Sequence, residues 1–167
     1  MTLAELNALT DARAREELLR CCGCERWAAD VAAGRPYESK EALLEAADAA
    51  WDNADRSELL EAFAHHPRIG GKDALRAKFA ATSAWARGEQ SGAASADEAT
   101  LDALAAGNAE YEAKFGHIFI VCATGKSAAQ MLDMLKARLP ASSEAELRTA
   151  AGEQAKITKI RLEKLLS

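Results

Sequence analysis

The chain has 167 residues, of which 49% are hydrophobic and 28% charged, enough for one domain with a real core and not comfortably enough for two. Its 40 alanines accompany only two valines and five isoleucines, and this excess of helix formers over β-branched residues makes an all-β fold improbable. The net charge is −5 and no basic block is present, which disfavours nucleic-acid binding. Without a long apolar run or the features of a signal peptide, we expect a cytoplasmic protein with no membrane contact.

Helix signals recur along the chain. Four patterns place a capping side chain three residues before a glutamate: Thr2 with Glu5, Asp55 with Glu58, Ser95 with Glu98, and Ser143 with Glu146. The apolar spacing predicts helices over residues 2–9, 11–22, 25–33, 39–53, 55–64, 73–87, 96–115, 127–139 and 143–166. Because the connections are short, we predict an all-α, single-domain compact helical bundle of about eight or nine helices over residues 1–167.

Two adjacent stretches have distinctive patterns. Residues three and four apart line one face of the predicted helix 96–115, which Gly116 can end through a left-handed cap: Leu101, Leu104, Asn108, Tyr111 and Phe115. Asn108 interrupts this apolar stripe, so it is either buried with a partner or turned toward solvent or a site. The next stretch, residues 118–123, is an apolar run without helical character, and some of its backbone groups should be available to a neighbour or a ligand.

The four cysteines do not form a recognisable metal or disulfide framework. Cys21, Cys22 and Cys24 crowd one short stretch, Cys122 lies far away in the sequence, and no CxxC pair or histidine cluster completes a set of four ligands. We therefore predict reduced thiols on or inside a helix end, and no metal.

The best candidate for chemistry is His66, in the sequence His-His-Pro-Arg-Ile-Gly-Gly over residues 65–71. Pro67 disfavours the α conformation at His66, so the helix over residues 55–64 should end here and present an imidazole at its tip. The helix dipole raises proton affinity at such a position, which suits a catalytic base, although a capping role is the plainer interpretation. His117, beside the apolar run, is a weaker candidate.

Three further groups are weak when taken alone. Glu89 could orient an imidazole and Gln90 could donate to a carbonyl, but a solvated loop explains both equally well. The stretch over residues 123–127 resembles the end of a phosphate-binding loop and fails that test, because the first glycine would fall at Ile120; a docking point for an anion or carbonyl remains. Taken alone, Arg161 is interpreted as an ordinary surface arginine.

Taken together, these pieces resemble the 2-oxo-4-hydroxy-4-carboxy-5-ureidoimidazoline (OHCU) decarboxylase family. The resemblance runs essentially end to end through four motifs: His66 to Gly70; Glu89-Gln90; Asn108-x-x-Tyr111-x-x-Lys114-Phe115-Gly116-x-x-Phe119-Ile120-Val121; and Glu153-x-x-Lys156-Ile157-x-x-x-Arg161-Leu162. The chain departs from the family in having Ala86 where a serine is common, and in a longer spacing from His66 to Glu89.

The resemblance implies an all-α homodimer that needs no metal or organic cofactor. It implies conversion of OHCU to (S)-allantoin in urate catabolism, with a functional link to urate oxidase and 5-hydroxyisourate hydrolase. His66 would handle a hydroxyl proton while Glu89 orients it. The implied substrate-binding residues are Pro67, Gln90, Phe119, Ile120, Val121 and Arg161.

Two other functions remain open from the sequence. The chain could be a helical interaction or regulatory module in which the histidine pair only caps a helix. It could also be a hydrolase that uses His66 and Glu89 to activate water on a related ureide.

Overall fold

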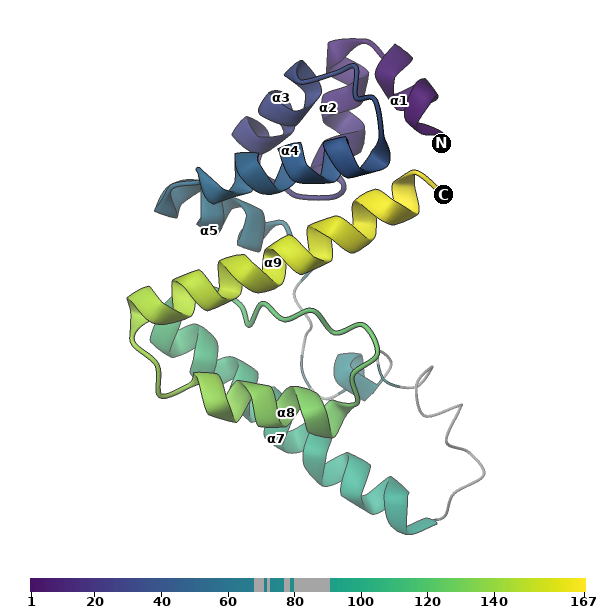
Figure 1. Cartoon of the computed structure of the whole chain (residues 1–167). Helices are drawn as coiled ribbons and strands as arrows, with labels where there is room; N and C mark the ends of the chain where they lie inside the picture. The colour runs from purple at the N-terminus through teal and green to yellow at the C-terminus, as the bar shows by residue number, and fades with distance from the viewer. Residues whose placement is uncertain (68–70, 72, 77–78, 80–90) are drawn as a thin grey trace. The chain divides into compact units, whose positions relative to one another are not determined.

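This computed structural model describes residues 1–67, 71, 73–76, 79 and 91–167, with only the backbone described over residues 91–97. Within that part of the chain every regular element is a helix (Figure 1). The bounds are α1 Leu3–Ala8, α2 Asp11–Leu19, α3 Glu25–Ala33, α4 Lys40–Asp52, α5 Arg56–Ala64, α7 Ser91–Phe115, α8 Ala128–Arg138 and α9 Ser143–Leu165. Residues 73–76 are also helical. The predicted all-α class is confirmed.

The predicted helices agree with the described ones except near their ends. Residues 118–123 are outside any helix, as expected, while most of the predicted helix 73–87 lies outside the described residues. The capping boxes at Thr2 and Asp55 are confirmed. The cap predicted at Ser95 is wrong, because α7 is already helical at Ser91.

The cap predicted at Ser143 is displaced by one residue. Ser142 Oγ accepts a hydrogen bond from the backbone N–H of Ala145 at 3.2 Å, and Ser143 is the first residue of α9. Two consecutive serines offer equivalent caps, so the sequence pattern does not distinguish between them.

The chain divides into two compact units. Unit 1 comprises Met1–His66 and Ala151–Ser167, and unit 2 comprises Pro67–Ala150. Helix α9 therefore begins in unit 2 and ends in unit 1.

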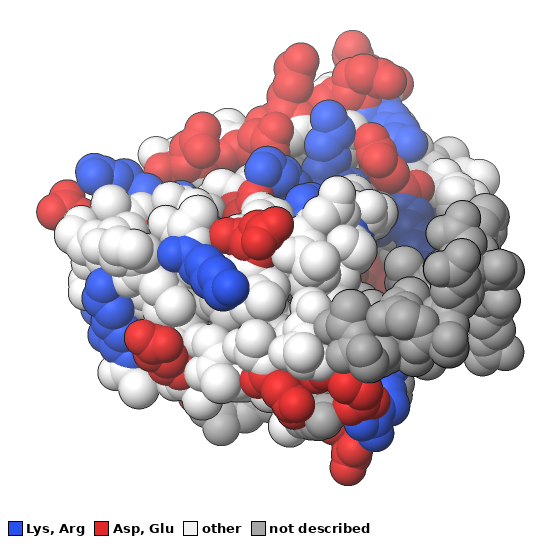
Figure 2. All heavy atoms as spheres, turned by 90° about the horizontal axis from the view of Figure 1, so that it is seen from below, with Lys and Arg blue, Asp and Glu red and all other residues white. Residues whose placement is uncertain are grey.

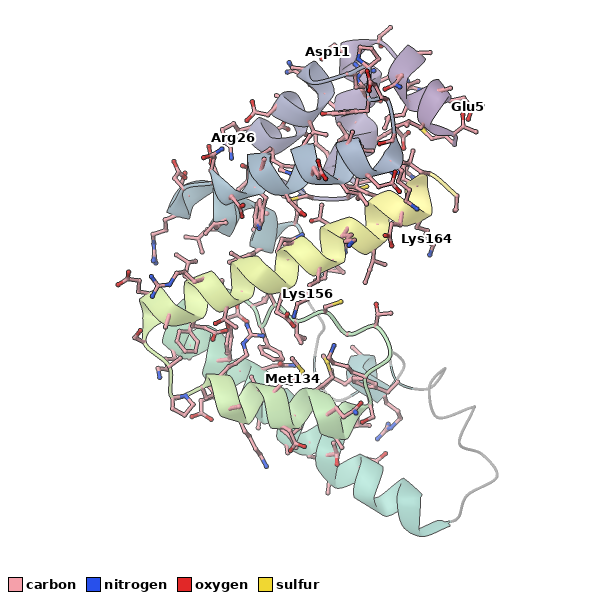
Figure 3. The ribbon with its side chains drawn as sticks, in the orientation of Figure 1. Glu5, Asp11, Arg26, Met134, Lys156 and Lys164 are labelled. Atoms are coloured by element: carbon pink, nitrogen blue, oxygen red, sulfur yellow. The ribbon has the colours of Figure 1, made fainter. Side chains whose placement is uncertain are left out.

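Unit 1 packs α1 to α5 with the second part of α9. Two buried tryptophans tie these helices together: Trp27 Nε1 donates to the carbonyl of Ala47 on α4, and Trp51 Nε1 donates to that of Ala151 on α9, each at 2.9 Å. Arg26 on α3, labelled in Figure 3, donates from Nε to Glu58 on α5 at 2.7 Å. The two indole bonds satisfy N–H groups that burial would otherwise leave unpaired.

Unit 2 is built on α7 and α8, which lie side by side (Figure 1). The stripe predicted on α7 faces its core: Leu101, Leu104, Tyr111 and Phe115 are buried, together with Leu75, Met131 and Leu135. Asn108 is half-buried. Gly116 ends α7 with a φ of 78°, which confirms the predicted left-handed cap.

The charged side chains are mixed on the face shown in Figure 2, where lysines and arginines lie interspersed with acidic residues. This agrees with the net charge of −5. Within the part of the chain that the structure describes, no helix combines the length and apolarity needed to cross a bilayer.

Candidate functional site

His66 lies at the corner that follows α5. The helix ends at Ala64, and the backbone N–H of His66 donates to the carbonyl of Phe63 at 3.2 Å. The His66 side chain is half-buried, whereas His65 is exposed. The predicted end of the helix before Pro67 is thus confirmed.

A glycine fixes the path of the chain at this corner. A Cβ atom added to Gly23 would lie 2.3 Å from both Cβ and Cγ of His65. No real side chain tolerates that distance, so the turn over residues 21–24 approaches the histidine pair closely only because residue 23 has no side chain.

His66 is joined to α9 by a buried polar network that the sequence analysis missed. Its Nε2 lies 2.5 Å from Oε1 of Gln154, and Nε2 of Gln154 donates to Oγ1 of Thr158 at 3.0 Å. Gln154 is 0% exposed and Thr158 7%. The available signal was their spacing: residues 154, 158 and 161 share the helix face that buries Leu162.

Arg161 continues the same face of α9. It is half-buried rather than a surface side chain, and its Nη1 donates to the carbonyl of Cys21 at 3.3 Å. Through the turn over residues 21–24, the structure thus brings Arg161 and His66 into one part of unit 1.

The cysteines are buried reduced thiols, as predicted. Burial raises the pKa of Cys21 to about 11, although Arg161 acts in the opposite direction. Burial likewise raises the pKa of Cys22 to about 12, against a hydrogen bond from Thr158 that lowers it. The thiols of Cys21 and Cys22 therefore stay protonated near neutral pH, which makes them poor nucleophiles.

In unit 2, side chains contact the non-helical run over residues 118–123 at the carbonyl of every second residue. The carbonyl of Ile118 lies 2.9 Å from His117 Nδ1, that of Ile120 accepts from Arg138 Nη1 at 2.7 Å, and that of Cys122 accepts from Lys126 Nζ at 2.7 Å. Such alternation is typical of an extended chain, in which the backbone groups of successive residues point to opposite edges.

Arg138 is itself held by a buried cluster that the sequence analysis did not identify. Its guanidinium pairs with Oε1 of Glu146, and the same oxygen accepts a hydrogen bond from the hydroxyl of Tyr111 at 2.5 Å. The guanidinium also stacks on Phe119, with its Cζ 4.6 Å from the ring centroid. Burial raises the pKa of Tyr111, and the bond to Glu146 adds to that effect. The cluster ties α7, α8 and α9 to the run that contains Phe119.

The remaining predicted site residues fall elsewhere. Pro67 is exposed and is the first residue of unit 2. Phe119 and Val121 are half-buried in unit 2, and Ile120 is 2% exposed. Glu89 and Gln90, as well as Ala86, lie outside the described residues.

The described fold and site define an all-α protein in which an imidazole at a helix end belongs to a buried polar network. A crystal structure of OHCU decarboxylase in the presence of (S)-allantoin has a similar fold, with a TM-score of 0.72 and 34% identity over 90% of this chain and 97% of that one. The sequence model of the family described as OHCU decarboxylase matches residues 7–163. The chain belongs to that family.

Two curated relatives extend the comparison. The chain is 39% identical over 150 residues to the uric acid degradation bifunctional protein TTL of Arabidopsis thaliana, covering 88% of this chain and 45% of that protein. It is 34% identical over 143 residues to the mouse OHCU decarboxylase, covering 86% of this chain and 80% of that protein. The chain thus spans less than half of the Arabidopsis protein.

Proposed function

We propose that this chain is a carboxy-lyase that decarboxylates OHCU to (S)-allantoin in urate degradation, without a metal or organic cofactor. The observation that carries the proposal is the similarity over 90% of the chain to an OHCU decarboxylase crystallised with (S)-allantoin. The substrate supplies its own electron sink: the electron pair released as carbon dioxide leaves flows into the adjacent ring C=N. The protein then needs to orient the substrate and move protons.

In the proposed site, His66 takes the substrate's hydroxyl proton and Glu89 helps to orient the imidazole. Arg161 binds a substrate oxygen. Its Nη1 already donates to the carbonyl of Cys21, but the guanidinium has further N–H donors for the substrate. Gln90 contacts a carbonyl of the ring or ureido group, and Pro67 lines the site.

The non-helical run contributes Phe119, Ile120 and Val121 to this proposed site. Because Arg138 already occupies the carbonyl of Ile120, we assign the main polar contacts to the backbone of Phe119 and Val121, which face the opposite edge of an extended chain. Ile120 then contributes chiefly by anchoring the run, since its side chain is buried.

The wider setting is also part of the proposal. Residues 1–167 act as one OHCU decarboxylase domain, in support of which the family match spans residues 7–163 and so both units. The enzyme is a cytoplasmic homodimer, functionally linked to urate oxidase and 5-hydroxyisourate hydrolase, which generate its substrate.

The test supplies purified protein with urate that has been freshly oxidised and passed through the hydrolase step. A decarboxylase accelerates loss of the ultraviolet and circular-dichroism signals of OHCU and accumulates optically active allantoin. His66→Asn should lower the rate roughly 10²- to 10⁴-fold with an unchanged far-ultraviolet spectrum. The exposed neighbour supplies the matched control, His65→Asn, which should remain active.

Other outcomes would contradict the proposal. A ureide hydrolase would leave the carboxyl carbon in its product, and an interaction module would not change the rate at all. Loss of activity on treatment with a chelator would overturn the cofactor-free reaction.

A further inference from the structure

We propose that Gln154 is a positioning residue that fixes the tautomer of His66, with the hydrogen on Nε2 and the basic lone pair on Nδ1. This inference rests on the proposed function, in which the His66 ring takes up a proton from the substrate. It adds a residue of α9 to that site and states which ring nitrogen receives the proton.

The first step is the position of the amide. Gln154 is fully buried, and its Oε1 lies 2.5 Å from Nε2 of His66. A carbonyl oxygen is only an acceptor, so at this distance the ring nitrogen must be the donor. The neutral ring has one N–H, and the contact with Gln154 places it on Nε2.

The second step is the orientation of the amide, which Thr158 determines. Nε2 of Gln154 donates to Oγ1 of Thr158 at 3.0 Å. A hydroxyl oxygen has lone pairs that accept hydrogen bonds. Because Oγ1 of Thr158 accepts this bond, the NH₂ group of the amide faces Thr158 and its oxygen faces His66.

The third step is the consequence for proton transfer. When Nδ1 takes up a proton, the Nε2–H remains on the oxygen of Gln154 and becomes a stronger, charge-assisted donor. Gln154 thus stabilises the charged ring modestly and stays neutral itself. A carboxylate in its place would stabilise the imidazolium much more and would hinder release of the proton.

The surroundings restrict movement of the pair. Lys156, labelled in Figure 3, marks the stretch of α9 that carries Gln154 and Thr158. On the other side, the close approach of Gly23 to His65 fixes the corner that carries His66. Both partners of the hydrogen bond therefore start from well-packed backbone.

The primary test is ¹⁵N NMR of the histidine ring nitrogens in the full chain, at a pH at which the rings are neutral. The chain has three histidines, and the signals of His66 are those lost in His66→Asn. Protonated and unprotonated ring nitrogens resonate in well-separated ranges. We expect Nε2 in the protonated range and Nδ1 in the unprotonated range, and the reverse pattern would overturn the inference.

The second test is the pH dependence of kcat for two variants. Gln154→Met removes the acceptor and should lower kcat on the order of 10- to 100-fold, with its acidic inflection moved to lower pH. Gln154→Glu should move that inflection to higher pH, because a carboxylate favours the imidazolium. A residue that only filled space would not shift the inflection in opposite directions.

The control is Gln130→Met, which makes the same chemical change at an exposed position on α8 and should alter neither readout. The proposed function and the role of Gln154 are tested separately. If the wild-type chain does not decarboxylate OHCU, the proposed function falls, while the NMR result still decides the tautomer. If the wild type is active but shows the reverse tautomer, or if both variants shift the inflection in the same direction, only the role of Gln154 falls.

Discussion

Arg138 joins the fully buried carboxylate of Glu146 to the backbone of Ile120. One nitrogen of the guanidinium donates to the Ile120 carbonyl at 2.7 Å, while others pair with Glu146, which is 0% exposed. An apolar, non-helical run is thereby held inside a helical protein by a charge-assisted bond. In the proposed enzyme this bond fixes the backbone that contacts the ureide.

Removing the arginine should be strongly destabilising. Arg138→Met leaves the buried Glu146 without its charged partner, and we expect the free energy of unfolding in urea to fall by about 3–5 kcal/mol. The additional variant Arg138→Met with Glu146→Leu should recover much of that loss, because no unpaired charge remains. The exposed pair of Arg148 and Glu144 provides the control, and Arg148→Met should change stability very little.

Two glycine substitutions should have opposite effects on thermal unfolding. Gly116 has a φ of 78°, so Gly116→Ala should destabilise the protein by about 1–2 kcal/mol. Gly152 lies within α9 with no atom within 4 Å of an added Cβ, so Gly152→Ala should stabilise it by about 0.5–1 kcal/mol. Shifts of Tm in the same direction for Gly116→Ala and Gly152→Ala would contradict this expectation of opposite effects.

Substitution of Gly23 should disturb the proposed catalytic corner. In Gly23→Ala the new Cβ would overlap the first side-chain atoms of His65, so the backbone that carries both histidines must move. Displacements of this kind can cost on the order of 10²-fold in rate. We expect a large loss of kcat when the variant is assayed on OHCU at a temperature where it remains folded. Gly152→Ala serves as the control, and its activity should match that of the wild type.

Stability should decline in alkaline solution because of the buried thiols. The pKa of Cys21 is raised from 9.0 to about 11 and that of Cys22 from 9.0 to about 12, so above pH 9 the unfolded chain loses protons that the folded chain keeps. The contribution of the thiols is complete below pH 9 and is lost as pH rises toward 11 and 12. Urea unfolding between pH 8 and about 10.5 should show this slope, and Cys22→Ala should flatten it.

Much of the fold was predictable because it depends on local patterns. Alanine-rich periodicity located the helices, and the left-handed requirement at Gly116 located the end of α7. Helix ends were less certain where two residues offer equivalent caps, as Ser142 and Ser143 do. Residues 118–123 were recognised as non-helical from their apolar run.

The polar networks were not predictable in the same way. Glu146 and Gln154 lie in a helix with many charged residues, where a carboxylate or an amide would ordinarily face solvent. Their partners lie outside that helix: Arg138 is eight residues from Glu146 but on α8, and His66 is 88 residues from Gln154. No spacing rule within one helix connects either pair. The motif at His66 located the candidate base, but its contact with Gln154 follows only from tertiary packing.

The division of α9 between the units has a consequence for synthesis on the ribosome. Unit 2 is continuous in sequence and is complete once Ala150 has emerged, whereas unit 1 waits for Ala151 and the residues that follow. Until then Trp51 has no carbonyl to receive its indole hydrogen, and His66 lacks its amide partner. The part of the protein translated first is therefore the last to reach its native state.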